Sequence, residues 1–77
     1  MHVVYAIRSI HRTYTYIGMT TEIDVRIERH NQGKNKTTRA YAPFELIYTK
    51  PFSTRAEARE HEKYLKTGVG RAFLKSL

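Results

Sequence analysis

A chain of 77 residues has room for one domain with a small core, and it contains no cysteine. This excludes a disulfide framework, a thiol nucleophile and a zinc–thiolate centre. Fourteen lysine and arginine residues against seven aspartate and glutamate residues give a formal net charge of +7. Such a surplus favours a polyanionic partner, with nucleic acid first and an anionic membrane second, although charge alone also fits an ordinary solvated surface.

Three features of the sequence bear on where the protein works. The N-terminal residues include no basic segment followed by a long apolar stretch, so we expect no signal peptide. No apolar run approaches the roughly 20 residues that span a bilayer, so we expect no membrane partner. The lack of cysteine fits an intracellular protein, and we expect a cytoplasmic location.

The first 18 residues predict an antiparallel β-hairpin. Residues 3–7 are apolar and largely β-branched, which favours a strand. The polar residues 8–12 turn the chain, and residues 13–17, rich in threonine and tyrosine, form the second strand. We expect Gly18 to end that strand.

A helix is predicted after the hairpin. Residues 21–24 resemble an N-cap with acidic residues in the first turn. The helix runs to about Asn31, where Gln32 and Gly33 end it. Residues 34–43 then form a polar, basic loop.

Side chains four positions apart give this helix two adjacent stripes. Ile23 and Ile27 define the stripe that faces the core. Arg26 and His30 are offset from it by one position, so we expect them where the helix meets the sheet. The alternatives are a surface ion pair between Arg26 and Glu22, and a capping role for His30 near the helix end.

The C-terminal half predicts another strand and a second helix. Residues 44–49 form the third strand, and Pro51 ends it or places its end at a sheet edge. Residues 54–57 form a capping box that opens a helix to about Lys66.

The chain is predicted to close with a short third helix. Gly68 and Gly70 are expected to break the chain before this helix, which covers residues 72–77. The resulting order, ββαβαα, implies a three-stranded antiparallel sheet with helices packed against it, an α+β fold. We expect residues 1–77 to form a single domain.

Glu62 lies on the apolar stripe of the second predicted helix. Ala58, four positions before it, and Leu65, three positions after it, share that stripe. An ionised carboxylate in such a place is costly unless it is paired or bound to a metal. A salt bridge to Arg26 or His30 is one way to satisfy Glu62, and a divalent cation is the other.

Because the positive charge favours nucleic acid as a partner, we consider phosphodiester hydrolysis, which has clear chemical requirements. A water must lose a proton, charge on the phosphate must be neutralised, and the leaving oxygen must be stabilised. Seven acidic residues, three of them beside basic side chains on the first helix, poorly support a two-metal site. One Mg²⁺ held by one carboxylate, waters and the substrate phosphate is chemically adequate, and Glu62 is the best candidate.

Three spaced motifs carry a family resemblance. They are Tyr5…Tyr16-Ile17-Gly18, Arg26-x-x-x-His30-Asn31 and Ser53-x-x-Ala56…Glu62-x-x-Leu65-Lys66. Their order and spacing resemble the GIY-YIG nuclease superfamily, most of all its short stand-alone bacterial members, which are related to the nuclease domain of bacterial excinuclease. The resemblance covers nearly the whole chain, although Val3 and Val4 replace the glycine and isoleucine of the first motif.

The resemblance implies a metal-dependent endonuclease that hydrolyses DNA. Tyr5 and Tyr16 would lie on adjacent strands, and one of the two phenols would deprotonate or position the attacking water. A free tyrosine has a pKa near 10, so a metal-bound hydroxide or Arg26 would have to favour the phenolate. Gly18 would let the backbone pass close to the substrate. Taken singly, both tyrosines also fit ordinary strand aromatics.

The resemblance assigns the other catalytic roles to three side chains. Arg26 would clamp the scissile phosphate and offset charge in the transition state. His30 would relay a proton, or orient a tyrosine or the phosphate. Glu62 would hold one Mg²⁺ or Mn²⁺ ion.

Further basic residues are expected to contact DNA phosphates. Such contacts give affinity that falls with salt and carry little sequence information. We therefore expect weakly selective or structure-selective cutting of branched, nicked or single-stranded DNA, or recruitment by a partner protein. DNA repair is one pathway that fits, with association with the nucleoid while DNA is bound. The residues are Lys34, Lys36, Arg39, Arg55, Arg59, Lys63, Arg71 and Lys75.

A non-catalytic module is the alternative function. Such a protein would keep the fold and bind DNA or RNA through its charge of +7, with no requirement for a metal. Retention of every polar position in the motifs favours the nuclease.

Overall fold

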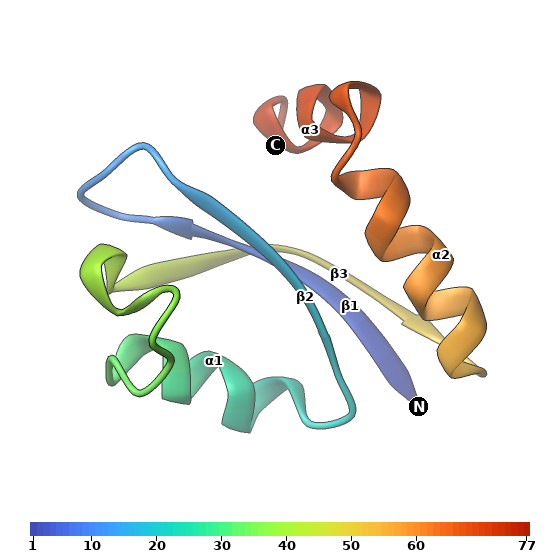
Figure 1. Cartoon of the computed structure of the whole chain (residues 1–77), viewed down its shortest axis with the longest axis horizontal. Coiled ribbons are helices and arrows are strands. Elements are labelled where there is room, and N and C mark those ends of the chain that lie inside the picture. The colour runs from blue at the N-terminus through green and yellow to red at the C-terminus, as the bar shows by residue number, and fades with distance from the viewer.

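The computed structural model describes residues 1–77 as a three-stranded sheet with helices on both of its faces (Figure 1). The predicted α+β class and the order ββαβαα are confirmed, with one short 3-10 helix added inside the predicted loop. No helix is long and apolar enough to cross a bilayer. The elements are β1 (His2–Ser9), β2 (Thr15–Thr20), α1 (Ile23–Asn31), the 3-10 helix (Arg39–Tyr41), β3 (Phe44–Phe52), α2 (Arg55–Leu65) and α3 (Gly68–Lys75).

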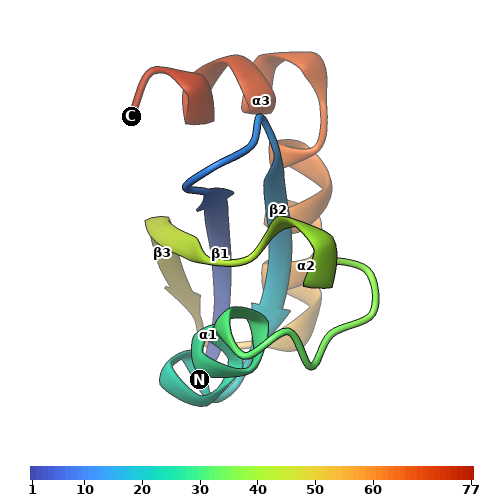
Figure 2. The ribbon, with the colours of Figure 1, turned by 90° about the vertical axis from the view of Figure 1, so that its left-hand side faces the viewer.

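β1 is the central strand and is antiparallel to both neighbours, in the order β2-β1-β3. Side chains alternate along a strand, so β1 contributes to two separate cores. Val4 and Ala6 pack with Leu65 of α2 on one face, whereas Tyr5 and Ile7 face α1 on the other. In Figure 2 the strands run side by side, with α2 behind them and α1 at their lower end.

The prediction that Gly18 ends the second strand is wrong. β2 begins at Thr15, passes through Gly18 and continues to Thr20. Within this strand Gly18 is the partner of Tyr5 on β1. Residues directly opposite each other in an antiparallel pair share a face of the sheet, so Gly18 lies beside the Tyr5 side chain.

The prediction that Gly68 and Gly70 break the chain is also wrong, because α3 contains both of them. Thr67 caps this helix, with its Oγ1 accepting a hydrogen bond from the Gly70 N–H at 3.2 Å. A Cβ at Gly70 would collide with the Tyr64 carbonyl oxygen and lie 2.5 Å from Leu65 Cα. Gly70 therefore allows α3 to pack tightly against the end of α2.

Several further boundaries differ from the predictions, among them those of β1, which covers His2–Ser9 rather than residues 3–7. The N-cap of α1 is Glu22 rather than Thr21, and its N–H donates to Thr20 Oγ1 at 3.1 Å. β3 continues through Pro51 to Phe52, so Pro51 does not end the strand but lies near the end of an edge strand, the second of the two predicted alternatives. An edge strand tolerates a proline because one side of its backbone has no partner strand to bond.

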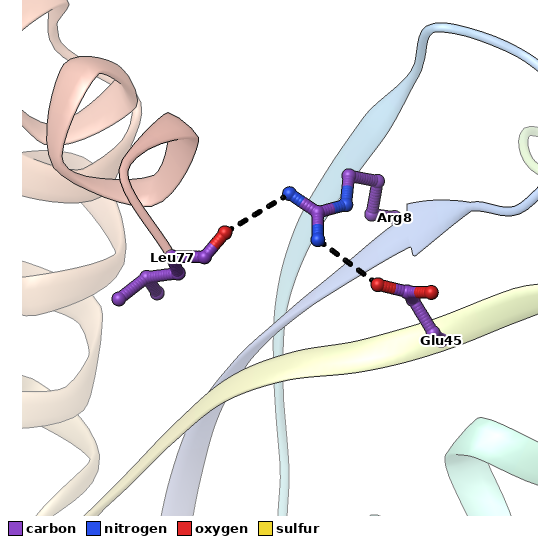
Figure 3. Close-up of polar contacts among 3 residues, drawn as sticks. All are labelled: Arg8, Glu45 and Leu77. Carbon is purple, nitrogen blue, oxygen red and sulfur yellow. Dashed lines mark hydrogen bonds and ion pairs between the residues drawn. The ribbon is translucent and has the colours of Figure 1, made fainter.

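Two long-range contacts hold the ends of the helices to the sheet. Arg8 of β1 donates to Glu45 Oε1 of β3 at 2.9 Å and to the Leu77 main-chain oxygen at 3.4 Å (Figure 3). At the end of α1, Asn31 Oδ1 accepts a hydrogen bond from the Phe44 N–H at 2.7 Å. The Asn31 side chain therefore joins α1 to the start of β3.

Candidate active site

A chain of hydrogen bonds joins β1, α1 and the loop after α1. Tyr5 Oη lies 3.0 Å from His30 Nε2, and His30 Nδ1 lies 2.8 Å from Thr38 Oγ1. All three residues are fully buried. Thr38 is not among the residues predicted from the sequence, because a hydroxyl inside a polar loop carries no periodic signal.

Burial keeps the Tyr5 phenol protonated. Loss of contact with water raises the pKa of Tyr5 from 10.0 to about 12; Tyr16 and Glu62 add to the rise, while Arg26 opposes it. At neutral pH the phenol therefore carries its proton, and because His30 Nε2 is the only hydrogen-bond partner of this buried hydroxyl, we assign the phenol as the donor. In this state Tyr5 is a weak base.

His30 is held neutral. Burial lowers the pKa of His30 below its usual 6.5, and the positive charges of Arg26 and Arg29 lower it further. Since Nε2 accepts a hydrogen bond from Tyr5, the ring proton lies on Nδ1 and is donated to Thr38 Oγ1. His30 thus links β1 to the loop, and a simple capping role at the helix end does not describe it.

The missing side chain of Gly18 makes room for the Tyr5 phenol. A Cβ at Gly18 would lie 2.6 Å from Tyr5 Oη and 3.0 Å from the ring of Tyr16. The Tyr16 ring centroid lies 6.3 Å from that of Tyr5 and 5.0 Å from that of His30. The two tyrosines and the histidine therefore form one aromatic cluster above Gly18.

Arg26 contributes a positive charge to this cluster. It lies partly buried on α1, the helix that carries His30. It forms no ion pair with Glu22 or with any other carboxylate. Its guanidinium lowers the pKa of both Tyr5 and His30, so its charge is felt at both groups and is free to meet an anion.

Glu62 belongs to α2, which packs on the opposite face of the sheet from α1. Its carboxylate pairs with Lys66 Nζ at 3.2 Å, so the expected alternative of a salt bridge to Arg26 or His30 is wrong. The Glu62 side chain is 19% exposed. Its charge adds to the raised pKa of Tyr5, so the carboxylate lies within electrostatic range of the phenol.

The available metal ligands are few. No group of three or more histidine, cysteine, aspartate or glutamate side chains gathers anywhere in the chain. Without such a cluster, the chain is suited to an ion that takes one carboxylate and fills its remaining positions with waters and substrate oxygens, as Mg²⁺ does. Glu62, whose carboxylate is reached by solvent, meets that requirement.

The residues predicted to contact DNA form three groups on the surface. One group also contains Lys66, which was not among the predicted contacts. The loop group consists of Lys34, Lys36 and Arg39, which are all exposed. The α2 group lines a shallow cleft of about 390 Å³ and consists of Arg55, Arg59 and Lys63. The α3 group lines a cleft of about 430 Å³ beside β2 and consists of Lys66, Arg71 and Lys75. Tyr16 also lines the cleft at the α3 group, whereas it does not line the cleft at the α2 group.

The neutral state of His30 makes stability depend on pH. Its folded pKa lies below 6.5, so the stability it contributes is complete above that value and is lost as the pH falls through the folded pKa. We expect the midpoint of thermal unfolding to fall between about pH 7 and about pH 5, a window around the ordinary histidine pKa. His61, whose pKa is lowered by burial and by Lys50, contributes in the same direction.

Unfolding measured by circular dichroism across this pH range tests the prediction. His30→Gln should reduce the pH dependence, while the matched variant His11→Gln, at an exposed position, should not. An unchanged pH dependence in His30→Gln would contradict the assignment.

Residues 1–73 match the family profile described as the GIY-YIG catalytic domain. The chain therefore belongs to the GIY-YIG family, and the resemblance drawn from its motifs is confirmed.

Within this family the chain is similar to short bacterial proteins named UPF0213. It is 46% identical over 52 residues to one from Bacillus licheniformis, covering 66% of this chain and 54% of the relative. It is 42% identical over 52 residues to YazA from Bacillus subtilis, covering 66% and 52%. It is 37% identical over 67 residues to one from Staphylococcus haemolyticus, covering 86% and 80%. The first two matches thus span about half of the relatives' length.

A solved structure supports the same fold. The solution NMR structure of the UPF0213 protein BH0048 from Bacillus halodurans matches with a TM-score of 0.57 and 35% sequence identity. The match covers 97% of this chain and 82% of that one. The three-stranded sheet with its helices is therefore shared with a solved relative.

Proposed function

We propose that the protein is an endonuclease that hydrolyses DNA phosphodiester bonds with one divalent metal ion. The observation that carries the proposal is the buried hydrogen bond of 3.0 Å between Tyr5 and His30, in a chain that matches the GIY-YIG catalytic domain. Tyr16 and Arg26 lie beside this pair, and Glu62 is within electrostatic range. Together these groups supply a proton path, a cation for the phosphate and a carboxylate for the metal.

The Tyr5–His30 pair is suited to moving a proton. Tyr5 is fully buried in the free protein, so the proposal requires the attacking water to reach its phenol when the substrate binds. As the phenol oxygen then takes a proton from this water, the proton of the phenol passes to His30 Nε2. The imidazolium so formed keeps its Nδ1–H bond to Thr38, and its Nε2 proton passes back through the phenol to solvent after cleavage, while the leaving oxygen on the opposite side of the phosphorus takes its proton from solvent. The depressed pKa of His30 favours that return.

Arg26 and Glu62 have complementary electrostatic roles in the proposal. The unpaired guanidinium of Arg26 binds the scissile phosphate and offsets the charge that develops on it. Glu62 holds Mg²⁺ or Mn²⁺, which when bound neutralises phosphate charge and makes water more acidic. Lys66 leaves Glu62 readily, because their ion pair is solvent-exposed and worth less than about 1 kcal/mol.

The experiment compares two tyrosines that make the same kind of bond. Labelled branched, nicked and single-stranded DNA is incubated with the protein, with and without Mg²⁺ or Mn²⁺. Tyr5→Phe should slow cleavage by about 100-fold or more, the size of a general acid–base contribution. Tyr48 Oη also lies 2.8 Å from a histidine Nε2, that of His61, so Tyr48→Phe is the control and should cut normally. Equal rates for both variants would refute the role of Tyr5.

One observation favours a second candidate, a nucleic-acid-binding module without catalysis. Glu62 is already paired with Lys66, and no cluster of metal ligands surrounds it. Such a module would bind DNA or RNA in a salt-sensitive manner, would need no metal and would be indifferent to Glu62→Gln. Absence of cleavage of every DNA substrate, together with such binding, would establish it over the nuclease.

A further inference from the structure

We propose that the cleft beside β2 binds the phosphate backbone of a single DNA strand that extends from the active site. This inference rests on the proposed function for the identity of the polyanion. It assigns to the α3 group a role that the other two basic groups do not share.

The cleft follows the free edge of the sheet. It is lined by residues 13–17 and by the α3 group, and its volume is about 430 Å³. Successive side chains of a strand point to opposite faces, so a cleft that touches Thr15, Tyr16 and Ile17, three consecutive residues of β2, follows the strand edge. β2 is an edge strand, and its outer side has no partner. A volume of this size matches pockets for single small molecules, so the cleft accommodates a short segment of one strand.

The positive charge that lines this cleft is only partly compensated. The lining includes three cations and no carboxylate, and of the three only Lys66 has an ion-pair partner, Glu62. Arg71 and Lys75 form no ion pair. Arg71 donates through Nε to the Lys66 carbonyl oxygen at 3.3 Å, which leaves its terminal nitrogens available to a phosphate.

The cleft is continuous with the candidate active site at two points. Tyr16 lines the cleft and also lies against His30, with ring centroids 5.0 Å apart. Lys66 lines the cleft and also pairs with Glu62. A strand whose scissile phosphate lies at Arg26 and Glu62 therefore has its neighbouring phosphates directed toward the α3 group.

The α2 group provides a control with the same charge. It also has three cations, but its cleft includes Glu60 and none of the candidate catalytic residues. The two triple variants, Lys66→Gln/Arg71→Gln/Lys75→Gln and Arg55→Gln/Arg59→Gln/Lys63→Gln, each remove three positive charges. Bulk electrostatics predicts the same loss of DNA affinity for both, whereas a specific cleft predicts a larger loss for the first.

Fluorescence anisotropy with a labelled single-stranded oligonucleotide, in EDTA and at several salt concentrations, measures the difference. Each lost phosphate contact lowers the slope of log K against log salt by about 0.7 for single strands, so the α3-group variant should lose about 2. The α2-group variant should lose less than half of that. Equal losses, or a larger loss in the α2-group variant, would overturn the proposal, as would tighter binding of a matched duplex.

A second variant guards against a folding defect. Lys66→Gln/Lys75→Gln leaves the side chain of Arg71 and its bond to the Lys66 carbonyl in place, and it should lower the slope by about 1.4. A slope unchanged in this variant would also overturn the proposal. Because binding is measured without metal, its result is independent of cleavage. A protein that never cuts DNA, and yet loses more affinity in the α3-group variant than in the α2-group variant, would refute the proposed nuclease activity and support the proposed DNA-binding cleft.

Discussion

Glu62→Gln is expected to abolish metal-dependent cleavage of DNA while leaving the fold and DNA binding nearly unchanged. Glutamine keeps the size of the side chain but removes the charge that holds the cation. A metal ion contributes several kcal/mol to the transition state of phosphate transfer, so the rate should fall by about 10³-fold or more. The only ion pair of Glu62, with Lys66, is solvent-exposed, so its loss should cost less than about 1 kcal/mol of stability.

Three measurements separate this effect from a structural one. Single-turnover cleavage gives the rate, calorimetric titration with Mn²⁺ gives the metal affinity, and thermal unfolding gives the stability. Glu60→Gln is the matched control, because Glu60 is exposed on the same helix and lies away from the site. If Glu62→Gln bound Mn²⁺ and cut DNA as well as the unmodified protein, the assignment of Glu62 would be wrong.

Gly70→Ala should cause the largest loss of stability of any single methyl addition in the C-terminal part of the protein. Alanine normally stabilises a helix interior by about 1 kcal/mol over glycine. Here the new methyl group would meet main-chain atoms of Tyr64 and Leu65, which cannot rotate away. α3 must then shift from α2 and expose Leu74, which is now only 3% exposed.

The expected net cost of Gly70→Ala is about 1–3 kcal/mol, typical of an overpacked core contact. For a domain of this size, it lowers the unfolding midpoint by roughly 4–24 °C. Gly68→Ala is the control, since no atom outside its own helix lies within 4 Å of the added methyl group. Equal unfolding temperatures for the two variants would show that α3 does not depend on this close approach.

The elements of the fold could be predicted because their signals are local. The signals include the apolar, largely β-branched run of residues 3–7, the capping box at Thr54 and the stripe of Ile23 and Ile27, and each depends on neighbours in the sequence. The errors at Gly18 and Gly70 have a common cause. A glycine inside a short element resembles a break, but here each glycine makes room for a group from another element, which no local pattern reveals.

Part of the candidate site could be predicted from the sequence, because motif spacing and helical spacing are also local signals. Motif spacing identified Tyr5 and His30, and the helical period correctly directed His30 toward the sheet. Thr38 could not be predicted because its contact with His30 depends on how the loop folds back over α1. The partner of Glu62 is Lys66, four residues later on the helix, a pairing that helical spacing itself favours.

The open edges of the sheet bear on how the free protein behaves at high concentration. A sheet of three strands leaves β2 and β3 each with one row of backbone groups that a second copy could pair with. On β3, Pro51 offers no N–H and Lys50 adds charge, while the α3 group borders the edge of β2. A second copy approaching either edge meets a charge of its own sign, so these features oppose edge-to-edge aggregation of the molecule.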